Sequence, residues 1–148
     1  MQERCKIGVV IGNANSPHAV NIMKGIDQAS KECDVQLMYF MNVSSPYTAQ
    51  LYPPDTSIGW DYQKSAIYDY ARYVKADVLI MTYGMMSIFM KSDYGKQYLE
   101  YFRNVPCVLI NEQTDRPNWT SIIIDNYNGI YELVEHLVRD HGYHNFAF

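Results

Sequence analysis

The stretch Lys6–Lys31, with the sequence KIGVVIGNANSPHAVNIMKGIDQASK, combines an apolar run, a polar loop and an amphipathic segment. The run Lys6–Gly12 is almost continuously apolar, which is typical of a strand in a parallel sheet that is covered on both faces. Ser16 followed by Pro17 indicates the start of a helix, because Ser caps free N–H groups and Pro fits the first helical position. The helix is expected to continue to about residue 31. Its expected buried face consists of Val20, Met23, Ile26 and Ala29.

The same alternation of apolar runs and amphipathic stretches continues along the chain. Further strands are expected at Val35–Val43, Asp77–Tyr83, Val105–Ile110, Ser121–Ile124 and Asn145–Phe148. Further helices are expected at Tyr62–Lys75, Tyr94–Arg103 and Asn128–Asp140, with Gly142 as the C-cap of the last. The middle helix could begin earlier, within Met85–Met90. This alternation predicts the α/β class, with an open, doubly wound parallel sheet and helices on both faces in three layers.

Two of these helices carry apolar residues at helical spacing, so each has one face that is expected to be buried. On the second helix of the chain this face consists of Ala66, Ile67, Tyr70, Ala71 and Val74. On the last helix it consists of Ile130, Leu133, Val134, Leu137 and Val138.

The composition is that of an ordinary globular domain of 148 residues, with a formal net charge of −4 and no run of Lys or Arg. This balance disfavours nucleic-acid binding by this segment, which would need a basic face. No apolar stretch is long enough for a signal peptide or a membrane span, so a cytoplasmic location is expected. We interpret Cys5, Cys33 and Cys107 as reduced and mostly buried thiols, with Cys33 near a helix end as the candidate for exposure.

Ligands of open α/β sheets bind beyond the carboxyl ends of the strands, so the loops that follow strands are the places to search. The candidate ligand-binding residues in those loops are Asn13, Asn15, His18, Gly84, Met85, Asn111, Glu112 and Asp125. Each has a simpler structural interpretation. The loop after the first strand can cap a helix, and the residues after the fourth strand can form a solvated turn. Met85 can pack in the core, and Asp125 can cap the last helix, which is its favoured role.

Residues 44–60 form a long expected loop that contains Tyr47, Tyr52 and Trp60. These rings could stack on a ring-shaped ligand, although such residues more often hold a long loop in place.

Three histidines near the end of the chain superficially suggest a metal site. His136, His141 and His144 lie close to Glu132 and Glu135. However, the H-E-x-x-H motif is absent, and the expected helix break at Gly142 lies between His141 and His144. No metal is therefore expected.

Several stretches resemble, in this order, the effector domain of the lactose-repressor family and of periplasmic sugar-binding proteins. The most specific is Ile124–Phe148, IDNYNGIYELVEHLVRDHGYHNFAF, beside the family's VxxDNxxG…A..HLxxxGHxxIAF. Weaker matches are Ile7–Ile11 with Lys24–Ile26, Asp77–Met81 beside "DGIII" and Pro106–Asn111 beside "PVVFID". The resemblance implies one lobe of a two-lobed, periplasmic-binding-protein-like type I fold, which clamps a ligand between its lobes and dimerises side by side. Residues 1–142 would form the N-terminal lobe, and residues 143–148 the crossover and the first strand of a second lobe.

The chain also departs from the family pattern. Five residues precede the first strand, so the helix-turn-helix head of the repressors is not expected in this segment. Asn15–His18 replaces the family's aromatic pair, and Asn111–Glu112 replaces its acid–arginine pair. The replaced pairs leave the ligand open. The absence of the head and the Tyr83–Gly84 pair after the third strand resemble the sensor modules of bacterial signalling proteins.

The sequence therefore predicts a small-molecule-sensing regulatory domain of a bacterial transcriptional regulator or signal-transduction protein, which acts by lobe closure. The expected partners are a sugar, nucleoside or similar ligand and a second copy in a homodimer, with no contact to nucleic acid or membrane. No enzymatic activity and no cofactor are expected, because the G-x-S-x-G, P-loop and G-x-G-x-x-G fingerprints are absent. The alternatives are a flavodoxin-like doubly wound enzyme and a ligand-free dimerisation module that associates through Phe146 and Phe148.

Overall fold

The computed structural model describes residues 4–43, 61–87, 90 and 92–147. The strands are β1 (Lys6–Ile11), β2 (Gln36–Met41), β3 (Val78–Met81), β4 (Cys107–Ile110) and β5 (Trp119–Ile122). The helices are α1 (Pro17–Cys33), α3 (Asp61–Tyr70), α4 (Tyr83–Ser87), α5 (Ser92–Tyr101) and α6 (Asn126–Arg139), with a 3₁₀ turn at Ala71–Tyr73.

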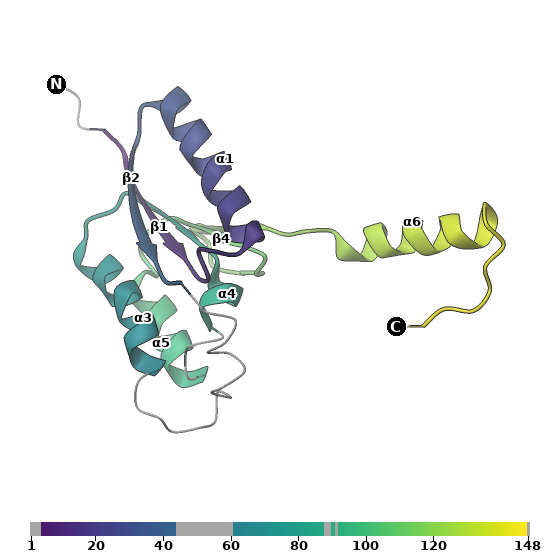
Figure 1. Ribbon diagram of the computed structural model, residues 1–148. Helices are drawn as coiled ribbons and strands as arrows, with labels where there is room; N and C mark the ends of the chain where they lie inside the picture. The colour runs from purple at the N-terminus through teal and green to yellow at the C-terminus, as the bar shows by residue number, and fades with distance from the viewer. Residues whose placement is uncertain (1–3, 44–60, 88–89, 91, 148) are drawn as a thin grey trace.

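The five strands form one sheet in the order β2-β1-β3-β4-β5, and every pairing is parallel. Helix α1 covers one face, while α3 and α5 cover the other, as Figure 1 shows. The predicted α/β class, with a parallel open sheet in three layers, is confirmed. Because the strands are parallel, all their carboxyl ends lie at one edge of the sheet, where α4 also lies (Figure 1).

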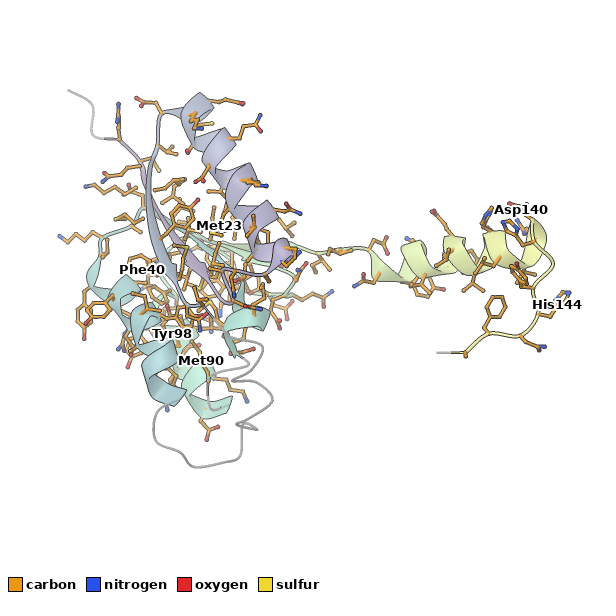
Figure 2. All side chains as sticks on the ribbon, viewed as in Figure 1. Met23, Phe40, Met90, Tyr98, Asp140 and His144 are labelled. Carbon is orange, nitrogen blue, oxygen red and sulfur yellow. The ribbon has the colours of Figure 1, made fainter. Side chains whose placement is uncertain are left out.

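The core has one cluster on each face of the sheet because successive side chains of a strand point to opposite faces. On the side of α1, Val9 and Ile11 pack with Ala19 and the partly buried Met23. On the other side, Val10 belongs to a larger cluster, which also contains Phe40, Tyr68, Leu79, Met81, Tyr98 and Leu109. Figure 2 shows Phe40 and Tyr98 on this second side and Met23 on α1.

The buried faces of two helices differ from those predicted. In α1 the fully buried residue is Ala19, where a small side chain lets the helix start approach the sheet, and Ala29 is exposed. In α3 the fully buried residue is Tyr68, whereas Tyr70 is 62% exposed. Tyr68 fills the space between α3 and α5, and its carbonyl accepts a hydrogen bond from the Tyr98 hydroxyl at 2.9 Å. Which tyrosine is buried depends on how α3 lies against the rest of the core, and helical spacing alone cannot show it.

Strand β5 begins two residues earlier than predicted. Trp119 opens it and is buried, with the Arg116 guanidinium 4.6 Å from its ring centroid. The predicted strand Ser121–Ile124 is therefore wrong by two positions, since the parallel register pairs Cys107 with Trp119. Burial of a large indole against the sheet fixes this register.

Three smaller expectations are also wrong. Tyr83 is the first residue of α4 rather than the last of β3. Residues 145–147 are not in a strand, because none of the described strands lies beside them to complete the hydrogen bonds that a strand requires. Of the cysteines only Cys107 is buried, whereas Cys5 joins Cys33 as exposed.

Helix α6 projects away from the three layers, as Figure 1 shows. Its predicted apolar face forms, yet no residue of the helix is buried. Ile130 is 55% exposed, Leu133 51% and Val138 37%. The expectation that this face is buried is therefore wrong for the described residues, since none of the three layers reaches it.

The difference in packing between the core and the projecting helix can be measured by changing one leucine in each to alanine. We predict that Leu109→Ala, in the core, lowers the free energy of unfolding by about 2–5 kcal/mol because it leaves a cavity. Leu133→Ala on α6 should change it by less than about 0.5 kcal/mol, as exposed substitutions generally do. Urea denaturation followed by circular dichroism measures both, and equal losses would contradict this description of the core.

Candidate functional site

The carboxyl edge of the sheet is built around Gly12, directly after β1. A side-chain carbon at this position would lie 2.6 Å from the backbone carbonyl carbon of Met85, so only glycine lets α4 come this close. The Gly12 N–H donates to the hydroxyl of Thr82 at 3.1 Å, and this contact is buried. The loops after β1 and β3 are thus locked together at the edge.

The ends of β1 and β2 are joined by Asn42, a polar residue that is only 7% exposed. Its side-chain oxygen accepts a hydrogen bond from the N–H of Asn13 at 2.8 Å, and its backbone carbonyl accepts one from Ala14 at 2.8 Å. Asn13 has a φ of 50°, a left-handed conformation that asparagine tolerates better than most residues. The backbone therefore turns sharply at the predicted site.

Two predicted site residues that are far apart in sequence meet at this edge. The Nε2 atom of His18, in the first turn of α1, lies 2.9 Å from the side-chain nitrogen of Asn111. Asn111 has a φ of 61°, and its N–H donates to the carbonyl of Ile122 at 2.8 Å. Both side chains are exposed. The structure thus brings the loops after β1 and β4 together through an exposed polar pair.

Glu112 lies beside the loop that follows β3. A side-chain carbon built at Gly84 of α4 would be 3.6 Å from the Glu112 carboxylate, an ordinary contact distance, so Glu112 lies beside the start of α4. Burial and, to a lesser extent, the charge of Glu112 raise the pKa of Tyr83. The phenol stays protonated near neutral pH, as tyrosine ordinarily does, and keeps its hydrogen-bond donor.

The remaining predicted site residues have mainly structural roles. Met85 packs against the core cluster on the side of α1, which agrees with its core interpretation. Asp125 caps α6: its carboxylate accepts hydrogen bonds from the Asn128 N–H at 3.0 Å and from the Asn128 side chain at 2.6 Å. These two hydrogen bonds lower the pKa of Asp125. The capping role is confirmed, and a ligand role for Asp125 stays a prediction, as it does for the exposed Asn15.

Thr82, Asn42 and Tyr83 belong to this edge but were not predicted as site residues. Thr82 and Asn42 are the polar residues that directly follow β3 and β2, so the rule that selected Asn13 and Asn111 could have found them. Tyr83 was hidden because its apolar ring continues the hydrophobic pattern of β3. Tyr47, Tyr52 and Trp60 lie outside the described residues.

The most enclosed hollow that we find on the described part of the chain is elsewhere. It measures about 160 Å³ and is lined by Ala71, Arg72, Val74, Ala76, Leu79, Tyr101, Phe102 and Val105. Ala76 and Val105 precede β3 and β4, so this hollow faces the amino ends of the strands. Small-molecule sites usually occupy about 300–1,000 Å³, which makes it too small for most ligands. Among the described residues, neither this hollow nor the shallower one on α6 lies at the carboxyl edge.

Neither a metal centre nor a membrane segment is found in the described part of the chain. Across residues 4–43, 61–87 and 92–147, no three His, Cys, Asp or Glu side chains are placed to hold one metal ion together. Within the same ranges no helix has the length and apolar character to cross a membrane.

A comparison with known proteins found no family model that matches this chain and no curated protein similar to it.

The contribution of the buried hydrogen bond between Gly12 and Thr82 to stability can be measured by substituting Thr82. We predict that Thr82→Val, which keeps the shape but removes the acceptor, lowers the free energy of unfolding by about 1–3 kcal/mol. Thr82→Ser should keep most of that stability. Thr120→Val on the exposed side of β5 is the matched control and should have little effect. Thermal or urea unfolding measures all three, and equal effects of the two valine variants would refute the role of Thr82.

Proposed function

We propose that this chain is one lobe of a two-lobed, small-molecule-sensing regulatory domain of the periplasmic-binding-protein type, related to the lactose-repressor effector domain. It binds its ligand at the carboxyl edge of the sheet and has no catalytic role. The observation that carries the proposal is the contact between His18 and Asn111, which joins the loops after β1 and β4 at that edge. Ligand sites of open parallel sheets lie at this place.

The chemistry of the edge favours a neutral or cationic ligand that is rich in hydrogen-bond donors. Glu112 offers a carboxylate, and the Asn111 side chain offers a carbonyl oxygen. Asn13, Tyr83 and His18 add groups that can accept or donate. Hydroxyl groups of a sugar or nucleoside, or the ammonium of an amino acid, match these groups. An anionic ligand would be repelled by Glu112.

The exposed apolar face of α6 supports the second part of the proposal, a second lobe. A helix with a strong apolar face normally buries it against another layer, and the described layers leave Ile130 and Leu133 half exposed. A second α/β lobe packed on this face would also cover the open carboxyl edge and complete a cleft. Closure of the two lobes around a ligand would then bias an attached output domain, as in a transcriptional regulator or signalling protein of the cytoplasm.

The ligand hypothesis can be tested on this chain by nuclear magnetic resonance, which detects weak binding to half a site. We predict that a sugar, nucleoside or amino acid shifts amide signals around Asn13, His18 and Asn111. Asn111→Gly removes the side-chain amide while keeping the left-handed backbone, and His18→Ala removes its partner. Each should weaken binding about 3–10-fold, the value of one hydrogen bond. His144→Ala is the control and should bind normally.

The proposal fails if no compound of these classes shifts the edge signals at millimolar concentration. It also fails if the shifts gather instead around the hollow at Tyr101 and Phe102.

A second candidate function is dimerisation through α6, and the exposed apolar side chains favour it directly. Leu133 is 51% and Phe146 38% exposed, and exposed apolar patches commonly mark protein interfaces. In this alternative a second copy of the chain, rather than a second lobe, covers the helix.

Light scattering separates the two candidates. Dimerisation predicts a mass twice the 17.2 kDa of one chain, which falls to one chain in the double variant Leu133→Asp, Phe146→Asp. Tyr73→Asp, at a position that is 78% exposed and lies outside α6, should leave the mass unchanged. A monomeric wild-type chain at about 100 μM would exclude this candidate, because an interface that functions in solution binds more tightly than that.

A further inference from the structure

We propose that His136 and His141, at the end of α6, form a two-histidine site for a divalent transition metal ion such as Ni²⁺, Cu²⁺ or Zn²⁺. This site is separate from the carboxyl edge of the sheet and does not depend on the function proposed above. The sequence disfavoured a metal here, because the H-E-x-x-H motif is absent and the expected helix break at Gly142 separates His141 from His144. The turn instead brings the two rings together.

The distance between the two rings suits one shared ion. The Nε2 atoms of His136 and His141 are 3.1 Å apart. Two nitrogens that bind the same metal ion, each about 2.0–2.1 Å from it, lie about 2.9–3.4 Å apart when the nitrogen–metal–nitrogen angle is between its square-planar and tetrahedral values. Without a metal, one ring can donate a hydrogen bond to the other. The ring centroids are only 4.8 Å apart, too close for rings that meet head-on at this distance between the nitrogens, so both nitrogens are directed to one side of the line that joins them. Inclined rings at this separation can direct both lone pairs to one ion.

A carboxylate prepares the first of these histidines for metal binding. The Nδ1 atom of His136 lies 2.5 Å from the Asp140 carboxylate. Because a carboxylate only accepts hydrogen bonds, Nδ1 carries the ring proton and donates a hydrogen bond to Asp140. This leaves the lone pair on Nε2, which faces His141. Histidine ligands of metals almost always donate their other ring N–H to such a partner, which fixes the tautomer and the ring orientation.

The second histidine is held by the turn that follows the helix. Gly142 has a φ of 66°, a left-handed conformation that turns the chain back. The N–H groups of Gly142 and Tyr143 donate to the carbonyls of Val138 and Leu137, both at 3.1 Å. The Tyr143 ring stacks on His141 at 5.9 Å and 15°. Figure 2 shows Asp140 at this end of α6 and His144 in the segment beyond it.

The surroundings leave the pair accessible to an ion. The His136 side chain is 53% exposed, and the nearby Glu135 is paired with Arg139 at 2.7 Å rather than with a histidine. The described residues supply only these two ring nitrogens, so water or another molecule would complete the coordination. Imidazole ligands of this kind suit nickel, copper and zinc, and they exclude magnesium and calcium, which prefer oxygen.

The test is a calorimetric titration of the 148-residue chain with NiCl₂ and ZnCl₂ at about pH 7.5, since imidazole binds metals only in its neutral form. The exposed thiols are removed first by Cys5→Ser and Cys33→Ser, because thiolates compete for zinc. We expect one ion per chain. His136→Gln and His141→Gln should each lower the affinity at least about tenfold, and Asp140→Asn should lower it about 10–100-fold, as loss of such a partner generally does.

Two controls distinguish this site from unspecific binding. His144→Gln and His18→Gln remove the other histidines of the chain and should leave the affinity unchanged. The metal should also slow hydrogen exchange of the Gly142 and Tyr143 amides, because it links the two sides of the turn that they close. The proposal is overturned if no binding occurs at 1 mM metal. It is equally overturned if the His136 and His141 variants bind as tightly as the parent, or if the control variants lose the ion.

Discussion

The constraint on which the rest of this structure depends is the burial of β1 on both faces. Val9, Val10 and Ile11 are consecutive and all fully buried, so helices must cover the sheet on both sides. Parallel neighbours require crossover connections that return each strand to the same starting edge. As a result, every strand ends at one edge, and the polar residues that follow the strands gather there. The candidate site is thus a consequence of how the core is covered.

The edge acquires its shape from backbone positions rather than from a cavity. Gly12 permits the close approach of α4, and the left-handed conformations of Asn13 and Asn111 turn the chain as soon as each strand ends. Hydrogen bonds from Gly12 to Thr82 and from Asn13 to Asn42 hold the first turn in place, and the one from the Asn111 N–H to the Ile122 carbonyl holds the second. These backbone positions bring the polar residues of the candidate site together where the strands end.

The sequence predicted the layers well because apolar runs and helix caps are local signals. Ser16 caps α1 and Asp125 caps α6, as their residue types indicate. The errors arise where packing between segments that are distant in sequence determines which residue is buried or where a strand begins. Tyr68 rather than Tyr70 belongs to the core because of how α3 lies against its neighbours, and the buried Trp119 opens β5 two residues earlier than predicted. The approach of His18 to Asn111, 93 residues apart in the chain, and the turn that joins His136 to His141 are likewise invisible to spacing alone.

Helix α6 shows why periodicity predicts a helix but not what covers it. A helix of 14 residues is marginal by itself in water, so its stability must come from local contacts and from packing. The local contacts are present in the Asp125 cap and the Glu135–Arg139 pair, whereas the packing of its apolar face must come from outside the described layers. The link between this helix and the edge is short: α6 begins four residues after Ile122, whose carbonyl binds the N–H of Asn111. The helix thus begins close to the strand end that holds Asn111, the residue that contacts His18.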